Sequence, residues 1–267
     1  MRPLRIISGK EIDRGILPYP KSPIAEKIWE IISEKHEFAP LSQESLVNLG
    51  IANELLKKEA IIVYLNHSSE DDASVAIALA LSHLTNAVRF MGPAGMKHYD
   101  LKRDKKNGIL LRSLRLLNIH VIPVVQHDDL DNYSESKRNR MLKRLKKKSK
   151  SLLSKKGGIY GISPEGTRNQ EDFKLLPARP GIGKVGKYAP KNICYLPIAI
   201  VYKNQSDKPE IVVGNPETVN SLANRLNATL PKNEDQRAQK IADLLMYKLS
   251  LLLPKNIRGA YSNFKVK

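Results

Sequence analysis

The chain has 267 residues and is 41% hydrophobic, enough for one sizeable α/β domain with a small helical appendage. Its 45 lysines and arginines against 27 aspartates and glutamates give a net charge of +18, which predicts an anionic partner: nucleic acid, a membrane surface or a phosphorylated substrate. A single cysteine excludes a disulfide framework and a cysteine-based zinc cage. Neither a signal peptide nor a membrane-spanning apolar stretch is recognisable, so we expect a soluble or peripheral protein.

From the N-terminus, apolar residues at helical spacing predict two helices between residues 21 and 58, and we expect residues 1–58 to form a helical segment. Strands and helices then alternate. We expect strands at 60–65, 87–91, 118–125, 157–162, 193–202 and 210–213, and helices at 72–84, 105–117, 134–155 and 234–252. Pro123 favours an edge position for the third strand or a position at the end of that strand. Residues 59–267 are thus predicted to form an α/β domain with a largely parallel mixed sheet flanked by helices.

His67 and Asp72 lie where the first strand ends and a helix begins. Ligands of open α/β sheets bind at such strand ends. One helical turn can bring Asp72 back to the imidazole of His67, so that the carboxylate fixes the tautomer while the other ring nitrogen removes a proton. The same residues also fit a helix capping box formed by Ser69 and Asp72, and the two interpretations are compatible.

A second polar segment, Pro164 to Arg168, follows the strand at 157–162. Gly166 permits a tight turn with close backbone approach, and Arg168 can hold a phosphate through two hydrogen bonds, with Thr167 adding a hydroxyl. Glu165 can accept hydrogen bonds from a polyol or orient Arg168. An ordinary surface turn with a solvated arginine is the alternative.

Together these segments resemble the motifs of the glycerolipid acyltransferase family, which includes 1-acylglycerol-3-phosphate and glycerol-3-phosphate acyltransferases. The first is an Asn-His pair followed, after four intervening residues, by Asp72, and the second is Pro-Glu-Gly-Thr-Arg without a mismatch. Phe173-Lys174, Gly181 and the Leu-Pro-Ile stretch at 196–198 resemble further family elements. The resemblance covers about residues 60–202.

The resemblance implies transfer of a fatty acyl group from acyl-CoA or acyl-carrier protein to a glycerol hydroxyl, with no cofactor and no metal. His67 would be the general base and Asp72 its orienter, while Glu165, Gly166, Thr167 and Arg168 would bind the acceptor. The second motif of the family is usually a strand that carries a glycine and a phosphate-binding arginine. The corresponding strand here, at 118–125, runs into Gln126-His127 without an arginine, so His127 becomes the candidate cation. We expect lysophosphatidate as acceptor, with glycerol-3-phosphate or another lyso-lipid as the alternative.

The helix expected at 134–155 carries many basic residues and an apolar side. Such a basic amphipathic helix is typical of docking to an anionic membrane surface, which places the protein in the cytoplasm at the inner face of the membrane. A core-packed helix with a solvated basic face, and a nucleic-acid-binding helix, are the alternatives. A non-catalytic basic protein that binds RNA or membrane is the competing function, but it leaves both matched motifs unexplained, and the 6% aromatic residues form no stacking motif.

Overall fold

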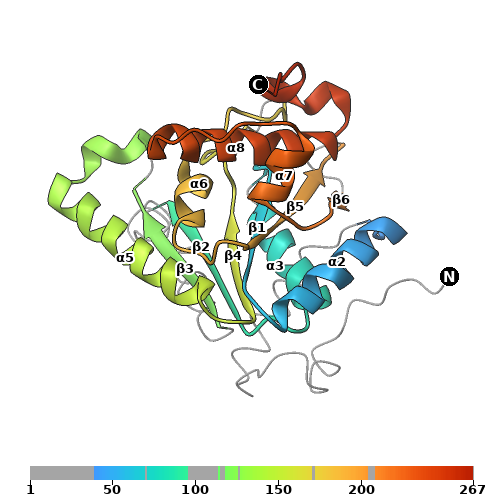
Figure 1. Ribbon diagram of the computed structural model, residues 1–267, viewed down its shortest axis with the longest axis horizontal. Coiled ribbons are helices and arrows are strands. Elements are labelled where there is room, and N and C mark those ends of the chain that lie inside the picture. Colours follow the sequence, from blue (N-terminus) through green and yellow to red (C-terminus); the bar gives the residue numbers. More distant parts are fainter. Residues whose placement is uncertain are drawn as a thin grey trace.

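We describe residues 39–69, 71–95, 114, 118–125, 127–169, 172–203 and 208–266 of a computed structural model of the chain (Figure 1). Helices and strands alternate through most of this part. Their order is α2 (Gln43–Leu56), β1 (Ile61–Leu65), α3 (Asp72–His83), β2 (Arg89–Gly95), β3 (Ile119–Val124), η4 (His127–Asn132), α5 (Glu135–Leu153), β4 (Gly158–Ile162), α6 (Gly181–Gly186), β5 (Cys194–Val201), β6 (Glu210–Val213), β7 (Glu217–Thr218), α7 (Val219–Arg225), α8 (Glu234–Leu251), η5 (Lys255–Ile257) and η6 (Gly259–Tyr261).

The strands form one mixed sheet in the order β3-β2-β4-β1-β5-β6, and β7 pairs with β5 away from this path. All pairs among β1 to β5 are parallel, whereas β6 and β7 run antiparallel to β5. The predicted α/β class and largely parallel mixed sheet are therefore confirmed. Pro123 lies in β3 at the sheet edge, as expected. Proline has no backbone N–H, and at an edge no second neighbouring strand needs one as a hydrogen-bond donor.

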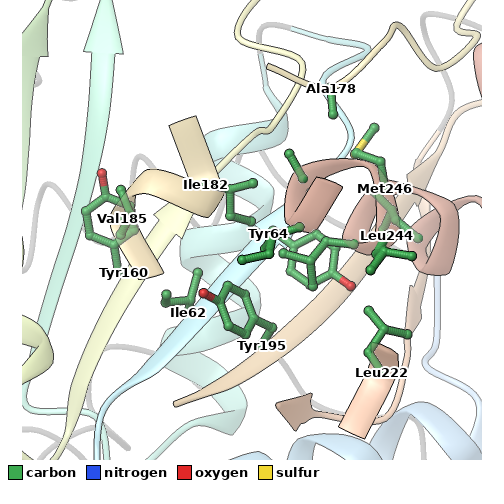
Figure 2. Close-up of a cluster of buried hydrophobic side chains, with 14 of the residues drawn as sticks. Ile62, Tyr64, Tyr160, Ala178, Ile182, Val185, Tyr195, Leu222, Leu244 and Met246 are labelled. Atoms are coloured by element: carbon green, nitrogen blue, oxygen red, sulfur yellow. The ribbon is translucent and has the colours of Figure 1, made fainter. Parts of the chain in front are cut away.

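Both faces of the sheet are covered, which explains why every residue of β1 is buried. Alternate residues point to opposite faces. Ile61, Val63 and Leu65 pack with α2 and α3 in one core, and Ile62 and Tyr64 pack with residues of α6, α7 and α8 in the other. Figure 2 shows this second core, in which tyrosine rings from three adjacent strands lie beneath the helices.

Helix α2 belongs to the core of the α/β domain. Leu49, Ala52 and Leu56 are buried in the first core, and the Asn48 side chain donates a hydrogen bond to the carbonyl oxygen of Val213 in β6. Residues 39–58 of the predicted helical segment thus share a core with the domain expected from residue 59 onward. Residues 1–38 lie outside the described residues, together with the first predicted helix.

Most predicted elements are present, with shifted ends. The second strand, expected at 87–91, runs to Gly95, and the predicted helix at 105–117 lies outside the described residues except for Leu114. Helices α6 and α7 and strand β7 were not expected from the sequence. In the described part of the chain no helix is both long and apolar enough to cross a membrane.

Candidate active site

Loops after three neighbouring parallel strands form the site. His67 follows β1, Pro164 follows β4 and Tyr202 follows β5, and β1 lies between the other two strands. Because the carboxyl ends of parallel strands share one edge of the sheet, both predicted motifs meet there.

Asn66 fixes the start of the first loop. Its buried side chain donates hydrogen bonds to the Ile200 carbonyl and to the Ser68 hydroxyl, both at 2.8 Å, and accepts one from the Ile200 N–H at 2.8 Å. The side-chain amide thereby bonds the chain to β5 one residue beyond Leu65, the last paired residue of β1. Only a side chain with both donor and acceptor groups can make these bonds. This explains why an asparagine precedes the histidine in the Asn-His pair.

The predicted contact between His67 and Asp72 is present. Nδ1 of His67 lies 3.3 Å from Oδ2 of Asp72, and the imidazole is 28% exposed while the carboxylate is fully buried. The same Oδ2 accepts hydrogen bonds from the backbone N–H groups of Ser68 at 2.6 Å and Ser69 at 2.8 Å. The carboxylate thus shapes the loop that carries His67 and also faces its ring.

Half of the capping-box alternative is also present. Asp72 accepts the N–H of Ser69, but the Ser69 hydroxyl accepts the N–H of Asp71 at 3.3 Å rather than that of Asp72. Helix α3 begins at Asp72, and the preceding Asp71 makes no side-chain cap. The buried Asp72 therefore organises the loop before the helix more than the helix itself.

Tyr202 is a site residue that the sequence did not indicate. Its hydroxyl donates a 2.9 Å hydrogen bond to Oδ1 of Asp72, and its ring stacks on Phe173 with centroids 6.2 Å apart. The available signal was weak: a tyrosine just beyond the carboxyl end of a strand paired with β1.

The Pro164–Arg168 turn is joined directly to the first loop by Glu165. Its Oε1 accepts the backbone N–H of His67 and its Oε2 that of Leu176, both at 2.8 Å. The N–H of Asn169 also donates to the His67 carbonyl at 3.2 Å. Burial raises the pKa of the Glu165 carboxyl to about 7, against the lowering effect of the two backbone donors. Glu165 thus holds the two motifs together, and its expected contact with the acceptor stays a prediction.

Gly166 adopts a φ of +71°, a conformation that favours glycine, which is consistent with the expected tight turn. A Cβ at this position would lie 3.0 Å from Cδ of Arg179 and 3.4 Å from its Nε. Arg179 also donates its backbone N–H to the Pro164 carbonyl at 2.8 Å. The side chain of a second arginine, Arg179, therefore lies against the turn. Thr167 and Arg168 of this turn are both half-buried.

His127 begins η4 after the edge strand β3. Strands β2 and β4 lie between β3 and β1, so His127 and His67 follow strands roughly 14 Å apart, at about 4.8 Å per strand. The role of His127 toward the acceptor stays a prediction.

Among the described residues no group of three or more His, Cys, Asp and Glu side chains could hold a metal ion. Cys194 is half-buried at the start of β5, the end opposite the site, and burial raises its pKa to about 11. A thiol with so high a pKa is a poor nucleophile at neutral pH, in line with an inert cysteine.

Residues 46–201 match the family model described as Acyltransferase. The chain belongs to the acyltransferase family. The matched range covers more than half of the sequence, extends from α2 to the end of β5 and contains both site loops. The membership confirms the glycerolipid acyltransferase resemblance and identifies an O-acyltransferase that acts in lipid biosynthesis. A comparison with curated proteins gives no match.

Proposed function

We propose that this acyltransferase moves a fatty acyl group from acyl-CoA or acyl-carrier protein to the free hydroxyl of 1-acyl-sn-glycerol-3-phosphate, a step of phospholipid biosynthesis. The supporting observation is the His67–Asp72 pair held against the Arg168 turn by Glu165. This arrangement joins the loop of a candidate hydroxyl-activating base to a turn that carries an arginine, a residue suited to bind a phosphate.

In the proposed reaction Asp72 accepts the Nδ1–H of His67, which leaves Nε2 free to accept the proton of the acceptor hydroxyl. The hydroxyl oxygen attacks the thioester carbonyl, a C–O bond forms and the C–S bond breaks. The proton held on His67 then passes to the departing thiolate. No acyl-enzyme is required, because the acceptor itself is the nucleophile.

The acceptor phosphate is assigned to Arg168 and Arg179. Arg168 lies in the turn that Glu165 ties to the His67 loop, and the Arg179 stem lies against Gly166 of that turn. Two guanidinium groups supply the planar paired donors that phosphate favours, and Arg179 offers a second cation in addition to the one predicted at His127.

The experiment is an acyl-transfer assay with labelled acyl-CoA and acyl-carrier protein against lysophosphatidate, glycerol-3-phosphate and other lyso-lipids. We expect His67→Ala to lower kcat by roughly 10²- to 10⁴-fold with an unchanged melting temperature. His83→Ala, at the other end of α3, is the matched control and should keep full activity. Retained activity in His67→Ala would refute the mechanism, and turnover of glycerol-3-phosphate alone would assign the alternative acceptor.

We further propose that α5 docks the enzyme on an anionic membrane at its cytoplasmic, inner face. Helix α5 lies along one side of the sheet (Figure 1). Its Leu152 and Leu153 are buried, while most of its lysines and arginines are exposed. Leu142 lies among these cations with 48% of its surface exposed, and can enter the lipid interface.

Vesicle binding tests the docking proposal. Replacing Lys143, Lys146, Lys147 and Lys150 by Gln should weaken binding to phosphatidylglycerol vesicles by about 10³-fold, at roughly 1 kcal/mol per charge. It should also flatten the salt dependence. The matched control removes four exposed lysines elsewhere, Lys191, Lys232, Lys255 and Lys265. Equal binding of the two variants would contradict a role for α5.

A further inference from the structure

The carboxylate of Asp72 faces two different groups of donors. Oδ2 lies toward His67 Nδ1 and the N–H groups of Ser68 and Ser69, whereas Oδ1 accepts a hydrogen bond from the Tyr202 hydroxyl. Because the carboxylate is fully buried, its orientation is set by these partners. The Tyr202 bond is the one that comes from another strand, since Tyr202 directly follows β5 and is 130 residues from Asp72.

Phe173 holds the Tyr202 ring in place. The two rings stack with an interplanar angle of 27°. Phe173 adopts a φ of +56°, an unfavourable conformation for an aromatic residue that persists only where surrounding contacts enforce it. Three residues later, Leu176 donates its N–H to Glu165. The segment that supports Tyr202 is therefore bonded to the residue that also holds the His67 loop.

From this geometry we infer that Tyr202 is a positioning residue for acyl transfer, fixing the Asp72 carboxylate so that Oδ2 faces His67, with Phe173 locking the tyrosine ring. The inference rests on the proposed function of His67 as base. Terminal torsions of carboxylates are broad, so a carboxylate without the Tyr202 bond would rotate more freely and orient the imidazole less well. The hydroxyl also offsets part of the Asp72 charge that stabilises the imidazolium.

The chemistry of Tyr202 suits this role. Burial raises the pKa of its hydroxyl well above the ordinary value, with the neighbouring Asp72 charge acting in the same direction. The phenol therefore keeps its proton over the working pH range and serves as a permanent donor to Asp72.

Tyr202→Phe tests the inference in the full-length enzyme with lysophosphatidate and acyl-CoA. Losing one hydrogen bond to a buried charge should lower kcat by roughly 10-fold while leaving both KM values unchanged. The acid limb of the kcat/KM profile should move to higher pH, because the less compensated Asp72 charge stabilises imidazolium. Phe173→Leu should lower kcat to a smaller extent.

Tyr195→Phe is the matched control, since Tyr195 is a buried tyrosine of β5, the strand that Tyr202 follows, and packs in the second core roughly 23 Å along the chain from Tyr202. Unchanged kcat and pH profile in Tyr202→Phe would overturn the inference, as would an equal loss in Tyr195→Phe. An inactive wild-type enzyme, or an active His67→Ala variant, would instead refute the proposed function, so the two failures are distinguishable.

Discussion

Replacing Glu165 by Gln should change how the stability of the enzyme depends on pH. Burial raises the pKa of the Glu165 carboxyl from its ordinary value of 4.5 to about 7 in the folded chain. Below pH 4.5 the carboxyl is protonated in both the folded and the unfolded chain. Between pH 4.5 and 7 the unfolded chain releases the proton while the folded chain keeps it, so the free energy of unfolding falls as pH rises.

The expected decrease in the free energy of unfolding follows from the two pKa values of Glu165, folded and unfolded. The difference between 4.5 and about 7 corresponds to about 3 kcal/mol, which the wild type loses across this pH range and Glu165→Gln does not. The Gln amide also presents an NH₂ group to one of the two backbone donors, His67 or Leu176, which lowers stability by about 1–3 kcal/mol at every pH. The variant should therefore be less stable than wild type at pH 4.5 and approach or exceed it at pH 8.

Urea unfolding of both proteins from pH 4.5 to pH 8 at fixed ionic strength provides the measurement. All other titrating groups are shared, so the difference between the two curves isolates Glu165. A difference in the free energy of unfolding that stays constant over this range would refute the reasoning, because it would mean that Glu165 is ionised in the folded chain throughout.

Three further expectations concern the site and its support. Arg168→Ala and Arg179→Ala should each raise the KM for the acceptor but not for the donor in steady-state assays, and an unchanged acceptor KM would remove that arginine from the phosphate site. Asp72→Asn should lower kcat by about 10³- to 10⁴-fold through loss of the imidazole tautomer, and near-normal turnover would exclude an orienting role. Gly183→Ala should cost about 3 kcal/mol in urea unfolding, because its Cβ would lie 2.1 Å from a carbonyl oxygen of α8, whereas Gly181→Ala, whose Cβ would meet nothing closer than 4.0 Å, should change little.

Much of the fold could be predicted because its central strands are short apolar runs, fully buried in β1 and almost fully in β5. Strand β6 begins and ends where expected, and β1, β4 and β5 differ from their predicted bounds by only one or two residues. Helix α6 was missed because three of its six residues are glycine, which disfavours a helix in isolation. Its glycine at 183 instead permits close packing against α8, a tertiary reason that local sequence does not show.

The site was predictable where its residues are close in sequence. The His67–Asp72 contact spans five positions and follows from a strand, a short loop and the first turn of a helix. Glu165 was expected to face the acceptor, yet its oxygens accept backbone N–H groups from two other segments. Tyr202 reaches Asp72 across 130 residues, and Arg179 returns to Pro164 through an irregular segment, so no spacing rule pointed to either residue.

Several hydrogen bonds of the His67 loop join residues far apart in the sequence, and this determines when the loop can form during synthesis of the chain. Asn66 bonds to Ile200, His67 to Glu165 and Asp72 to Tyr202, which are separations of 134, 98 and 130 residues. Closing such loops is entropically costly and slow compared with local contacts. The nascent chain therefore carries His67, and the local bonds of its loop to Asp72, long before the partners from the other strands are synthesised. The hydrogen bonds of the loop are complete only after residue 202 has left the ribosome.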